Sequence, residues 1–333
     1  MQVTGLGSSQ LARPTGPRAA ADLDRPLLLT PGQDLVGYVS SLAGRGLLTL
    51  ITSTSIIAVL LIFLFILKES WGFFSSGHAA QLFTSTGWYP QAQPPVFGGL
   101  ALLVGSGLVT AGAMAIAVPV GLLAAVFLSD IVSFQLRQVV KPILEILAAI
   151  PSVAYGFFAV LVLAPWMQRH LGLSTGTNAL NASIMLAIMA LPTIVSISED
   201  ALTAAGSELR AGAYALGATR AEVLLKVIIP AAHSGIIAAV VLGVMRAVGE
   251  TMVVWMASGN ASQIPHPWWD LTQSVRTMTA TIAGEMGETE KGSTHYHGLF
   301  AIGLLLLALT LVMNMASEYF MARAKRISRG KRA

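Results

Sequence analysis

Residues 47–67 read LLTLITSTSIIAVLLIFLFIL, a run of 21 residues without a charged side chain. A helix needs about 20 mostly apolar residues to cross the hydrocarbon core of a bilayer, so we expect this run to span a membrane. The composition of the whole chain agrees. Of its 333 residues, 54% are hydrophobic and 11% are charged, and the mean hydropathy is +0.71. Because a soluble domain carries about 25% charged residues, we expect an integral membrane protein.

Five further stretches are apolar and long enough to cross, which predicts an all-α membrane protein with six transmembrane helices. The second of the six is longer than one straight span needs. Pro119 lies inside it and predicts a tilted or kinked helix, because proline removes a backbone donor and bends the axis. The five further spans are expected over residues 98–128, 143–166, 179–197, 231–257 and 299–319.

Lys and Arg are distributed unevenly among the segments that connect the spans. With six spans, the segments on the side of the two termini hold 15 of the 20 Lys and Arg residues, and those on the other side hold 4. The remaining one, Arg246, falls inside the fifth span. Short cytoplasmic loops retain positive charge, so both termini are expected in the cytoplasm.

Residues 1–46 are rich in Ala, Gly, Pro and Arg and show no helical or strand period. We expect a mostly disordered cytoplasmic tail rather than a signal peptide, whose apolar core would begin earlier. The six-helix domain is then expected over 47–320, followed by a basic cytoplasmic tail over 321–333. Two longer connections, 68–97 and 258–298, are expected on the outer side. Their aromatic residues are expected at the level of the lipid headgroups: Trp71, Trp88, Tyr89, Trp268 and Trp269.

Few catalytic or metal-binding chemistries fit this sequence. The absence of cysteine excludes disulfides, thiolate metal sites and Cys nucleophiles. No Ser-His-Asp, paired-carboxylate or His-Glu-x-x-His arrangement is present, and the glycine-bounded stretch 287–293 lacks the lysine of a phosphate-binding loop. His295 and His297 have no third ligand nearby, so we interpret them as part of a solvated loop. The chain is therefore expected to be no enzyme and to hold no metal.

The connection between the fourth and fifth spans, residues 199–230, is too long for a tight turn. Leu202, Leu209, Ala213 and Leu216 make an apolar stripe at helical spacing, interrupted by glycines. The pattern alone allows two interpretations. The segment is either a helix pair that lies on the membrane surface or a docking element for a soluble partner.

Residues 209–220 read LRAGAYALGATR, and nine residues separate Gly217 from a group that reads VIIP over 227–230. This arrangement resembles the coupling motif of the permeases of ABC importers, which is Glu-Ala-Ala, three residues, Gly, nine residues and Ile-x-Leu-Pro. Ala211 stands where that family usually has Glu, and Gly212 stands where it has the first Ala. Gly217 is expected to permit a sharp turn and a close approach. The resemblance implies that six residues couple the chain to an ATPase: Leu209, Arg210, Ala213, Leu216, Gly217 and Pro230.

Residues 243–252 read GVMRAVGETM and are similar to the phosphate-specific branch of the same family. Ending in Glu-Thr-Met rather than Glu-Thr-Ala-Pro, they look more like the PstC type of subunit than the PstA type. Arg246 and Glu250 are four residues apart, so we expect them on one face of the fifth span and within reach of each other. Charges inside a membrane usually mark a pathway, and an Arg fork suits phosphate. Arg246, Glu250 and Thr251 are thus candidates for the substrate pathway. A purely structural ion pair is the alternative.

The resemblance implies a permease subunit of an ATP-driven phosphate importer in the plasma, or inner, membrane. It also implies the partners: a second permease of PstA type, a dimer of PstB-type ATPases that binds the ATP, and an external PstS-type phosphate-binding protein. No cofactor is expected in this chain, and no nucleic acid as a partner. Within the family, the alternatives are a PstA-type subunit or a permease for another oxyanion. Outside it, the alternative is a secondary transporter or channel.

Overall fold

The structure is a computed structural model that describes residues 31–330, and the structural statements below concern this range. The chain divides into two units, Met1–Phe63 and Leu64–Ala333, each described by itself. The described part of the first unit is helical and belongs to α2 (Pro31–Ser75), which continues into the second unit. Residues 31–46, expected within a mostly disordered tail, are helical, so that part of the expectation is wrong. Proline suits the first turn of a helix, where its missing N–H has no partner to lose. Residues 1–30 and 331–333 of the expected tails lie outside the described range.

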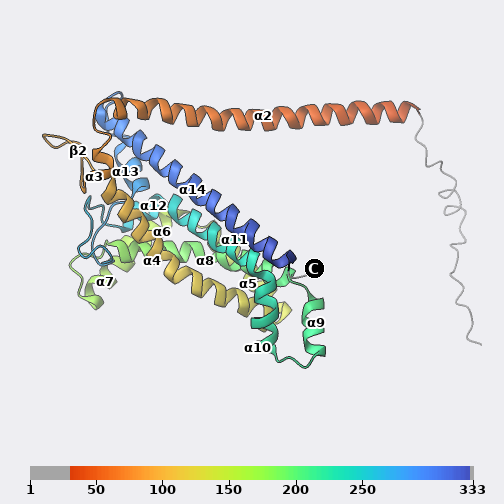
Figure 1. The fold of residues 1–333 in the computed structure, drawn as a ribbon. Coiled ribbons are helices and arrows are strands. Elements are labelled where there is room, and N and C mark those ends of the chain that lie inside the picture. Colours follow the sequence, from red (N-terminus) through yellow and green to blue (C-terminus); the bar gives the residue numbers. More distant parts are fainter. Residues whose placement is uncertain (1–30, 331–333) are drawn as a thin grey trace, which may run out of the picture. The chain divides into compact units, whose positions relative to one another are not determined.

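The second unit is mostly helical, with one small antiparallel ribbon near its start (Figure 1). Three of its helical segments are π-helical turns, named η1, η2 and η3. In chain order the elements are α3 (Gln81–Thr84), β1 (Trp88–Tyr89), β2 (Val96–Phe97), α4 (Gly99–Val126), η1 (Phe127–Ile131), α5 (Phe134–Ala149), α6 (Ser152–Phe158), η2 (Ala159–Leu163), α7 (Ala164–Leu171), α8 (Ala179–Ala204), α9 (Ser207–Ala215), α10 (Arg220–Glu222), η3 (Val223–Ile228), α11 (Ile229–Gly249), α12 (Met252–Ala257), α13 (Met278–Glu285) and α14 (Thr294–Gly330).

Five helices of the described range are long and apolar enough to cross a membrane, or six if one bent pair counts as a span. The bent pair corresponds to the third expected span. There, α5 and the segment Ser152–Leu171 meet at 85°, so the expectation of one helix over 143–166 is wrong. The break falls at Ile150, whose ψ of 129° is extended. The cause is Pro151, because a proline disfavours helical geometry in the residue before it.

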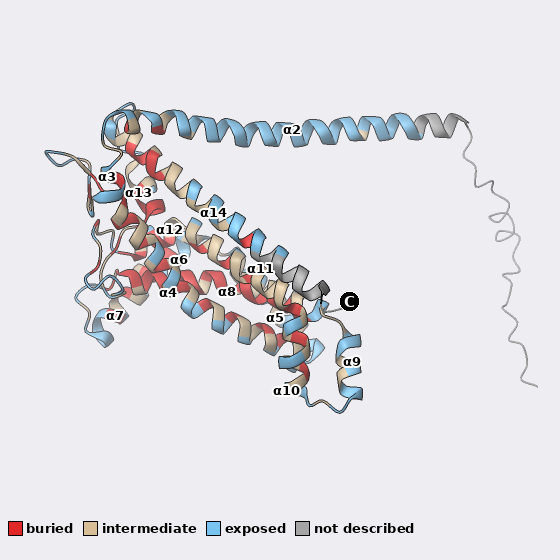
Figure 2. Cartoon of the chain, in the orientation of Figure 1, coloured by how far each residue is buried: buried red, intermediate tan, exposed pale blue. Residues whose placement is uncertain are grey.

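Helix α8 is the centre of the main core. It packs against α4 on one side and α11 on another, and it carries the densest set of buried residues in Figure 2. The contact with α4 is made by small side chains, including Ala113 and Ala117 on α4 and Ala182 on α8, all fully buried. The Ser183 hydroxyl also donates to the carbonyl oxygen of Val109 across this contact, at 3.1 Å. Small residues and hydroxyls are the means by which membrane helices approach closely without a hydrophobic drive.

A second core joins the ribbon, the end of α2, α13 and the start of α14. Its largest member is Trp88, whose side chain is 1% exposed, so its expected place among the lipid headgroups is wrong. The Trp88 indole stacks edge to face on Phe97, and its Nε1–H donates to Glu285. A buried indole needs such a partner for its N–H. Trp71, Trp268 and Trp269 are exposed.

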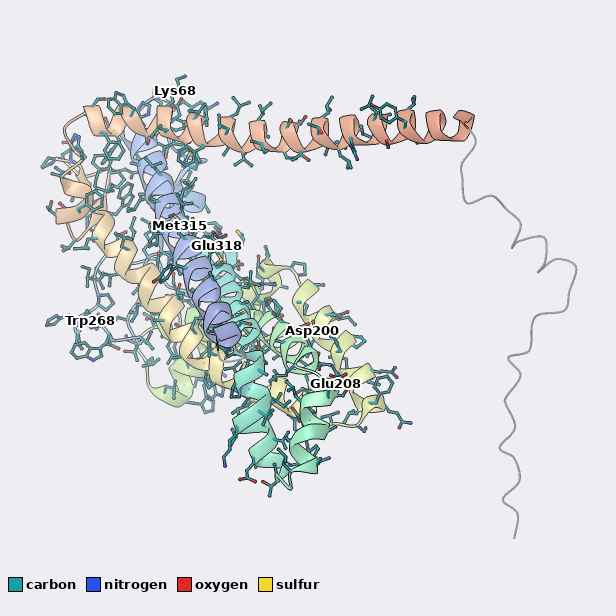
Figure 3. All side chains as sticks on the ribbon, turned by 45° about the vertical axis from the view of Figure 1, so that its right-hand side comes forward. Lys68, Asp200, Glu208, Trp268, Met315 and Glu318 are labelled. Atoms are coloured by element: carbon teal, nitrogen blue, oxygen red, sulfur yellow. The ribbon has the colours of Figure 1, made fainter. Side chains whose placement is uncertain are left out.

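The two ends of the second unit are built from different elements. Trp268 belongs to the loops between α12 and α13, whereas Glu208 on α9 lies at the opposite end of the bundle (Figure 3). The helix hairpin of α9 and α10 is therefore remote from the ribbon and the long loop after α12.

Candidate translocation and coupling sites

Arg246 lies near the end of α11 and is partly buried. Its Nη1 donates to Thr193 Oγ1 on α8 at 3.1 Å, and its Nη2 donates to the carbonyl oxygen of Ala148 on α5 at 3.3 Å. The hydroxyl of Tyr155 donates to the carbonyl oxygen of Leu147 at 2.9 Å. These side chains satisfy carbonyl groups that a helix end leaves free. Arg246 thus holds three helices together at the bend before Pro151 and uses two of the five donors of a guanidinium.

Glu250 is placed differently from the expectation. Helix α11 ends at Gly249, and Glu250 is extended, with ψ of 134°. Its Oε1 accepts hydrogen bonds from the amides of Met252 and Val253, at 3.2 and 3.4 Å, and so caps the start of α12. In the described part of the chain no ion pair joins Glu250 to Arg246, so the expected pairing on one helix face is wrong. The hydroxyl of Thr251, the third candidate, donates to the carbonyl oxygen of Gly249 at 3.4 Å.

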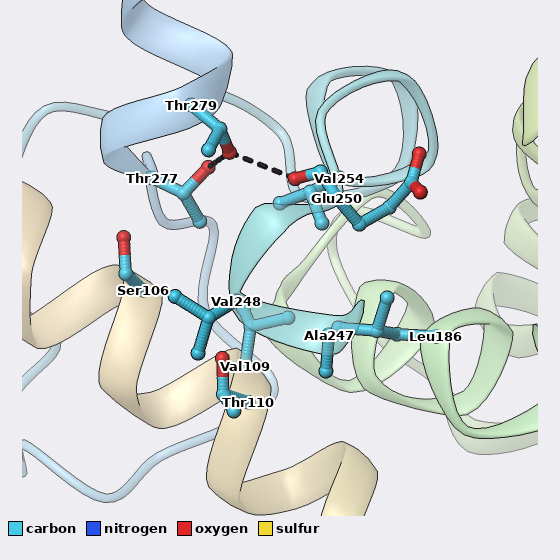
Figure 4. Close-up of a pocket in the computed structure, with 10 residues that line it drawn as sticks. All are labelled: Ser106, Val109, Thr110, Leu186, Ala247, Val248, Glu250, Val254, Thr277 and Thr279. Carbon is cyan, nitrogen blue, oxygen red and sulfur yellow. Dashed lines mark hydrogen bonds between the residues drawn. The ribbon is translucent and has the colours of Figure 1, made fainter. Parts of the chain in front are cut away.

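A small cavity of about 10 Å³ lies beside this helix break. That is the room of about one water molecule. Hydroxyl groups approach it from two directions: Ser106 and Thr110 on α4, and Thr277 and Thr279 at the start of α13 (Figure 4). Thr279 Oγ1 donates to the carbonyl oxygen of Glu250 at 2.8 Å, and the Glu250 carboxylate points away from Ser106 and Thr110.

The wall between α4 and the loop before α13 is tightly closed. Ser106 Oγ accepts a hydrogen bond from the amide of Met278 at 3.0 Å. One residue earlier, a Cβ added to Gly105 would lie 2.2 Å from the carbonyl oxygen of Arg276. Only glycine allows the two backbones to come this close. In this conformation the hydroxyl-lined cavity has no room for an anion larger than water.

The candidate coupling segment contains the end of α8, the helix α9 and the turn into α10. The turn after α9 is a Schellman motif. The amide of Gly217 donates to the carbonyl oxygen of Tyr214 at 2.9 Å, and the amide of Ala218 donates to the carbonyl oxygen of Ala213 at 3.2 Å. Gly217 has φ of +81°, which only glycine adopts readily, and no atom lies within 4 Å of a Cβ built on it. Within this chain Gly217 therefore serves the turn and not a close approach. Thr219 then begins α10 with a capping box.

The six coupling residues divide into two groups. Leu209 and Leu216 are exposed, at 38% and 90% of their surface, and Pro230 is exposed in the first turn of α11. Ala213 instead packs against the core around Val223 and Ile228. Gly217 is exposed in the turn after α9, and Arg210 turns inward to an acidic side chain. The six coupling residues thus face two ways.

A buried ionic network joins the first half of α5 to the C-terminal end of α8. Both lie on the side that is expected to face the cytoplasm. Glu199 is 2% exposed and pairs with Arg137 and with Lys141, the latter at 3.1 Å. Lys141 also reaches the exposed Asp200 at 2.6 Å. Burying a carboxylate is costly unless it is paired, so two cations and a hydroxyl from Thr203 are needed here. No local pattern in the sequence reveals this network, because Lys141 lies 58 and 59 residues from its two acidic partners.

At the other end, Glu285 is a second ionic centre that the sequence analysis missed. Its carboxylate pairs with Arg276 at 2.7 Å and with His295 at 2.7 Å, and it accepts the N–H of Trp88 at 2.9 Å. His297 bonds to the carbonyl oxygen of Glu69 at 2.7 Å. His295 and His297 therefore lie in the first turn of α14, partly buried, and their interpretation as a solvated loop is wrong.

Comparison with known sequences identifies the class of this fold. The family described as "Binding-protein-dependent transport system inner membrane component" matches residues 117–326. The chain belongs to this family, the permeases of ABC importers, and is a membrane protein with several spans. The resemblance noted in the coupling motif is confirmed. Membership implies that the chain works beside an ATPase, a substrate-binding protein and a second permease.

Individual relatives are more specific. The chain is 38% identical to the probable ABC transporter permease protein YqgH of Bacillus subtilis over 74% of this chain and 78% of that protein. It is 35% identical to the phosphate transport system permease protein PstC of Mesorhizobium japonicum over 72% of this chain and 77% of that protein. PstC 1 of Mycobacterium tuberculosis is 32% identical over 69% of this chain and 74% of that protein.

Among solved structures, a chain of the MetNI methionine ABC transporter in an inward-facing conformation has the same fold. It superposes with a TM-score of 0.52 and 19% identity, over 67% of this chain and 95% of that chain. The likeness agrees with the family assignment and concerns the fold.

Proposed function

We propose that this chain is a PstC-type permease subunit of an ATP-driven importer for inorganic phosphate. The observation that carries the proposal is the similarity, over about three quarters of the chain, to proteins named as PstC phosphate permeases. The partners follow from it: a PstA-type permease that completes the pathway, a dimer of PstB-type ATPases and an external PstS-type binding protein. ATP is bound and hydrolysed in the ATPases.

The orientation belongs to the same proposal. Both termini and the α9–α10 hairpin lie on the cytoplasmic side, where most Lys and Arg residues gather. The end of α2 with Trp71, the loop after α12 with Trp268, and the Glu285 centre on α13 then face outward and receive the binding protein. Six spans result if the bent pair of α5 and α6–α7 crosses the membrane as one broken span.

Arg246 is proposed to serve the anion. It lies within a predicted membrane span, it is partly buried, and its two hydrogen bonds leave further N–H donors. A guanidinium can donate two parallel hydrogen bonds to two phosphate oxygens. Glu250 acts separately. By capping α12 it fixes the helix break beside the hydroxyl-lined cavity, and Thr251 starts the second half of that broken span. Broken helices of this kind line ion and substrate sites in other transporters.

The experiment that tests the function is reconstitution. The chain is placed in liposomes with its candidate partner permease, ATPase and binding protein, and ATP-dependent uptake of labelled phosphate is measured against sulfate and molybdate. We expect uptake of phosphate that needs both ATP and the binding protein. Equal uptake of the three oxyanions, preference for another anion, or uptake by this chain alone would contradict the proposal.

A further inference from the structure

One ion pair connects the coupling helix to the rest of the permease. The Nε of Arg210 on α9 lies 3.2 Å from Oδ1 of Asp130, and its Nη2 lies 3.5 Å from Oδ2. The two side chains are 21% and 22% exposed, so most of the pair is out of solvent. The Ser129 hydroxyl donates to Oδ2 of Asp130 at 2.7 Å and orients the carboxylate.

Asp130 occupies a joint between two helices. It lies in η1, the π-helical turn that ends the long helix α4, and the chain turns extended at Val132 before α5 begins. The same Arg210 donates from Nη2 to the carbonyl oxygen of Leu202, in the last turn of α8, at 3.2 Å. A cation is favourable at the C-terminal end of a helix, where carbonyl groups are left free. A single guanidinium therefore joins α9, the α4–α5 joint and the end of α8.

We propose that Arg210 is the positioning residue that carries movement of α9 into α4 and α8, with Asp130 as its partner in this chain. The inference rests on the proposed coupling role of residues 199–230. Leu209 and Leu216 are exposed and available to the ATPase, while Arg210 faces inward from the same short segment. Force applied to the exposed side chains reaches the membrane helices through the ion pair with Asp130 and the hydrogen bond to Leu202.

Ala211 fits this arrangement. The family motif usually has an acidic residue here, and Ala211 brings no charge to this position. With Ala211, the only carboxylate that the described contacts give Arg210 is that of Asp130. The positive charge of Arg210 is thereby paired inside the permease. Docking of the ATPase then depends mainly on the exposed apolar side chains of Leu209 and Leu216.

The test uses the full reconstituted complex with Arg210→Gln, Asp130→Asn and the charge exchange Arg210→Asp with Asp130→Arg. Each single change is expected to leave the ATPase bound and its basal hydrolysis intact. Stimulation of hydrolysis by the loaded binding protein should fall at least tenfold, and the exchange should restore it to within threefold of the wild type. Lys226→Gln is the matched control, because Lys226 is an exposed cation of the same region that pairs only with its neighbour Glu222.

A second readout does not depend on the substrate. The chain contains no cysteine, so cysteines introduced at the exposed positions Glu208 and Ser133 place spin labels on α9 and beside η1 without interference from others in this chain. The label distance is expected to stay constant between nucleotide-free and ATP-bound states in the wild type, and to change in Arg210→Gln. A wild-type distance that changes with nucleotide, or an exchange variant that stays uncoupled, would overturn the inference. Failure of phosphate uptake in the wild type would overturn the proposed function instead.

Discussion

The Nη2 of Arg246 lies 3.3 Å from the carbonyl oxygen of Ala148, so a side chain of α11 caps the end of α5. The hydroxyl of Tyr155 caps the preceding carbonyl, that of Leu147, from the far side of the bend. Two side chains from different helices thus replace the hydrogen bonds that the break at Ile150 removes. Any movement of α11 along its axis must either carry the bend with it or release these carbonyl groups.

The first prediction concerns the independence of Arg246 and Glu250. Arg246→Gln should lower phosphate uptake at least tenfold, which corresponds to about 1.4 kcal/mol, while assembly persists. Because no ion pair joins the two residues, the double variant with Glu250→Gln should recover nothing. Uptake by cells is measured for each variant and normalised to the assembled complex. Recovery of uptake in the double variant would mean that Arg246 and Glu250 depend on each other for structure, and would contradict a role of Arg246 in the pathway.

The second prediction uses the left-handed conformation of Gly217. Asparagine tolerates positive φ, whereas a β-branched residue does not. With φ of +81° and open space around the Cβ position, Gly217→Asn should remain close to wild type. Gly217→Val should strain the turn by about 1–2 kcal/mol and uncouple hydrolysis from the binding protein. ATPase stimulation in the reconstituted complex measures the difference. Equal behaviour of the two variants would show that the turn conformation is not what coupling needs.

The third prediction compares two glycines two residues apart on α4. Gly105→Ala would bring a Cβ to 2.2 Å from the carbonyl oxygen of Arg276, whereas a Cβ at Gly107 meets nothing within 4 Å. Overpacking of this kind costs about 1–3 kcal/mol, so Gly105→Ala should lower the Tm and loosen the loop before α13. Gly107→Ala should be neutral or stabilising by up to about 1 kcal/mol, as for glycine in a helix interior. Thermal unfolding in detergent tests both, and equal Tm values would contradict the close packing.

The fourth prediction separates a buried from an exposed acid. Removing the charge of Glu199 by Glu199→Gln leaves Arg137 and Lys141 without their buried partner, which costs about 3 kcal/mol for a buried pair and lowers the Tm of the complex. Asp200→Asn, next to it, removes an acid that is 61% exposed and should cost less than about 1 kcal/mol. A larger effect of Asp200→Asn would assign the network's stability to the surface contact.

The fifth prediction concerns salt. Leu209 and Leu216 are the exposed apolar side chains of the coupling motif, while Arg210 is engaged with Asp130. Raising the ionic strength from about 0.1 M to about 1 M shortens the screening length from about 10 Å to 3 Å. The Kd of the ATPase for the permease should change less than threefold over that range. Release of the ATPase at moderate salt would indicate an ionic docking surface.

Local patterns explain the parts of the fold that the sequence predicted. Apolar runs of the right length locate α4, α8, α11 and α14, because the thickness of the bilayer sets the least number of apolar residues that a crossing helix needs. The motif spacing locates the turn at Gly217, because a Schellman turn is encoded within six residues. Breaks within a span are harder to predict from the sequence. Pro151 signals the end of α5, but apolar residues on both sides of it make one continuous run.

Contacts between distant segments explain the remaining errors. Trp88 is buried because its indole finds Glu285, 197 residues away, and an aromatic residue in a loop gives no sign of such a partner. Arg246 finds Thr193 and Ala148, so its spacing from Glu250 does not decide its contacts. Helical spacing predicted their pairing only on the condition that the helix continued through Gly249, and it does not.

The π-helical turn η3 lies between the coupling hairpin and α11, within one continuous helical segment from Arg220 to Gly249. Each residue of an α-helix turns the chain by about 100°, so one residue more or less in this segment would rotate Arg246 away from Thr193 by that angle. The number of residues in this segment therefore sets the rotation of Arg246 about the helix axis, and that number is fixed. Among orthologous chains, we expect η3 to tolerate changes of residue type and to exclude insertions and deletions.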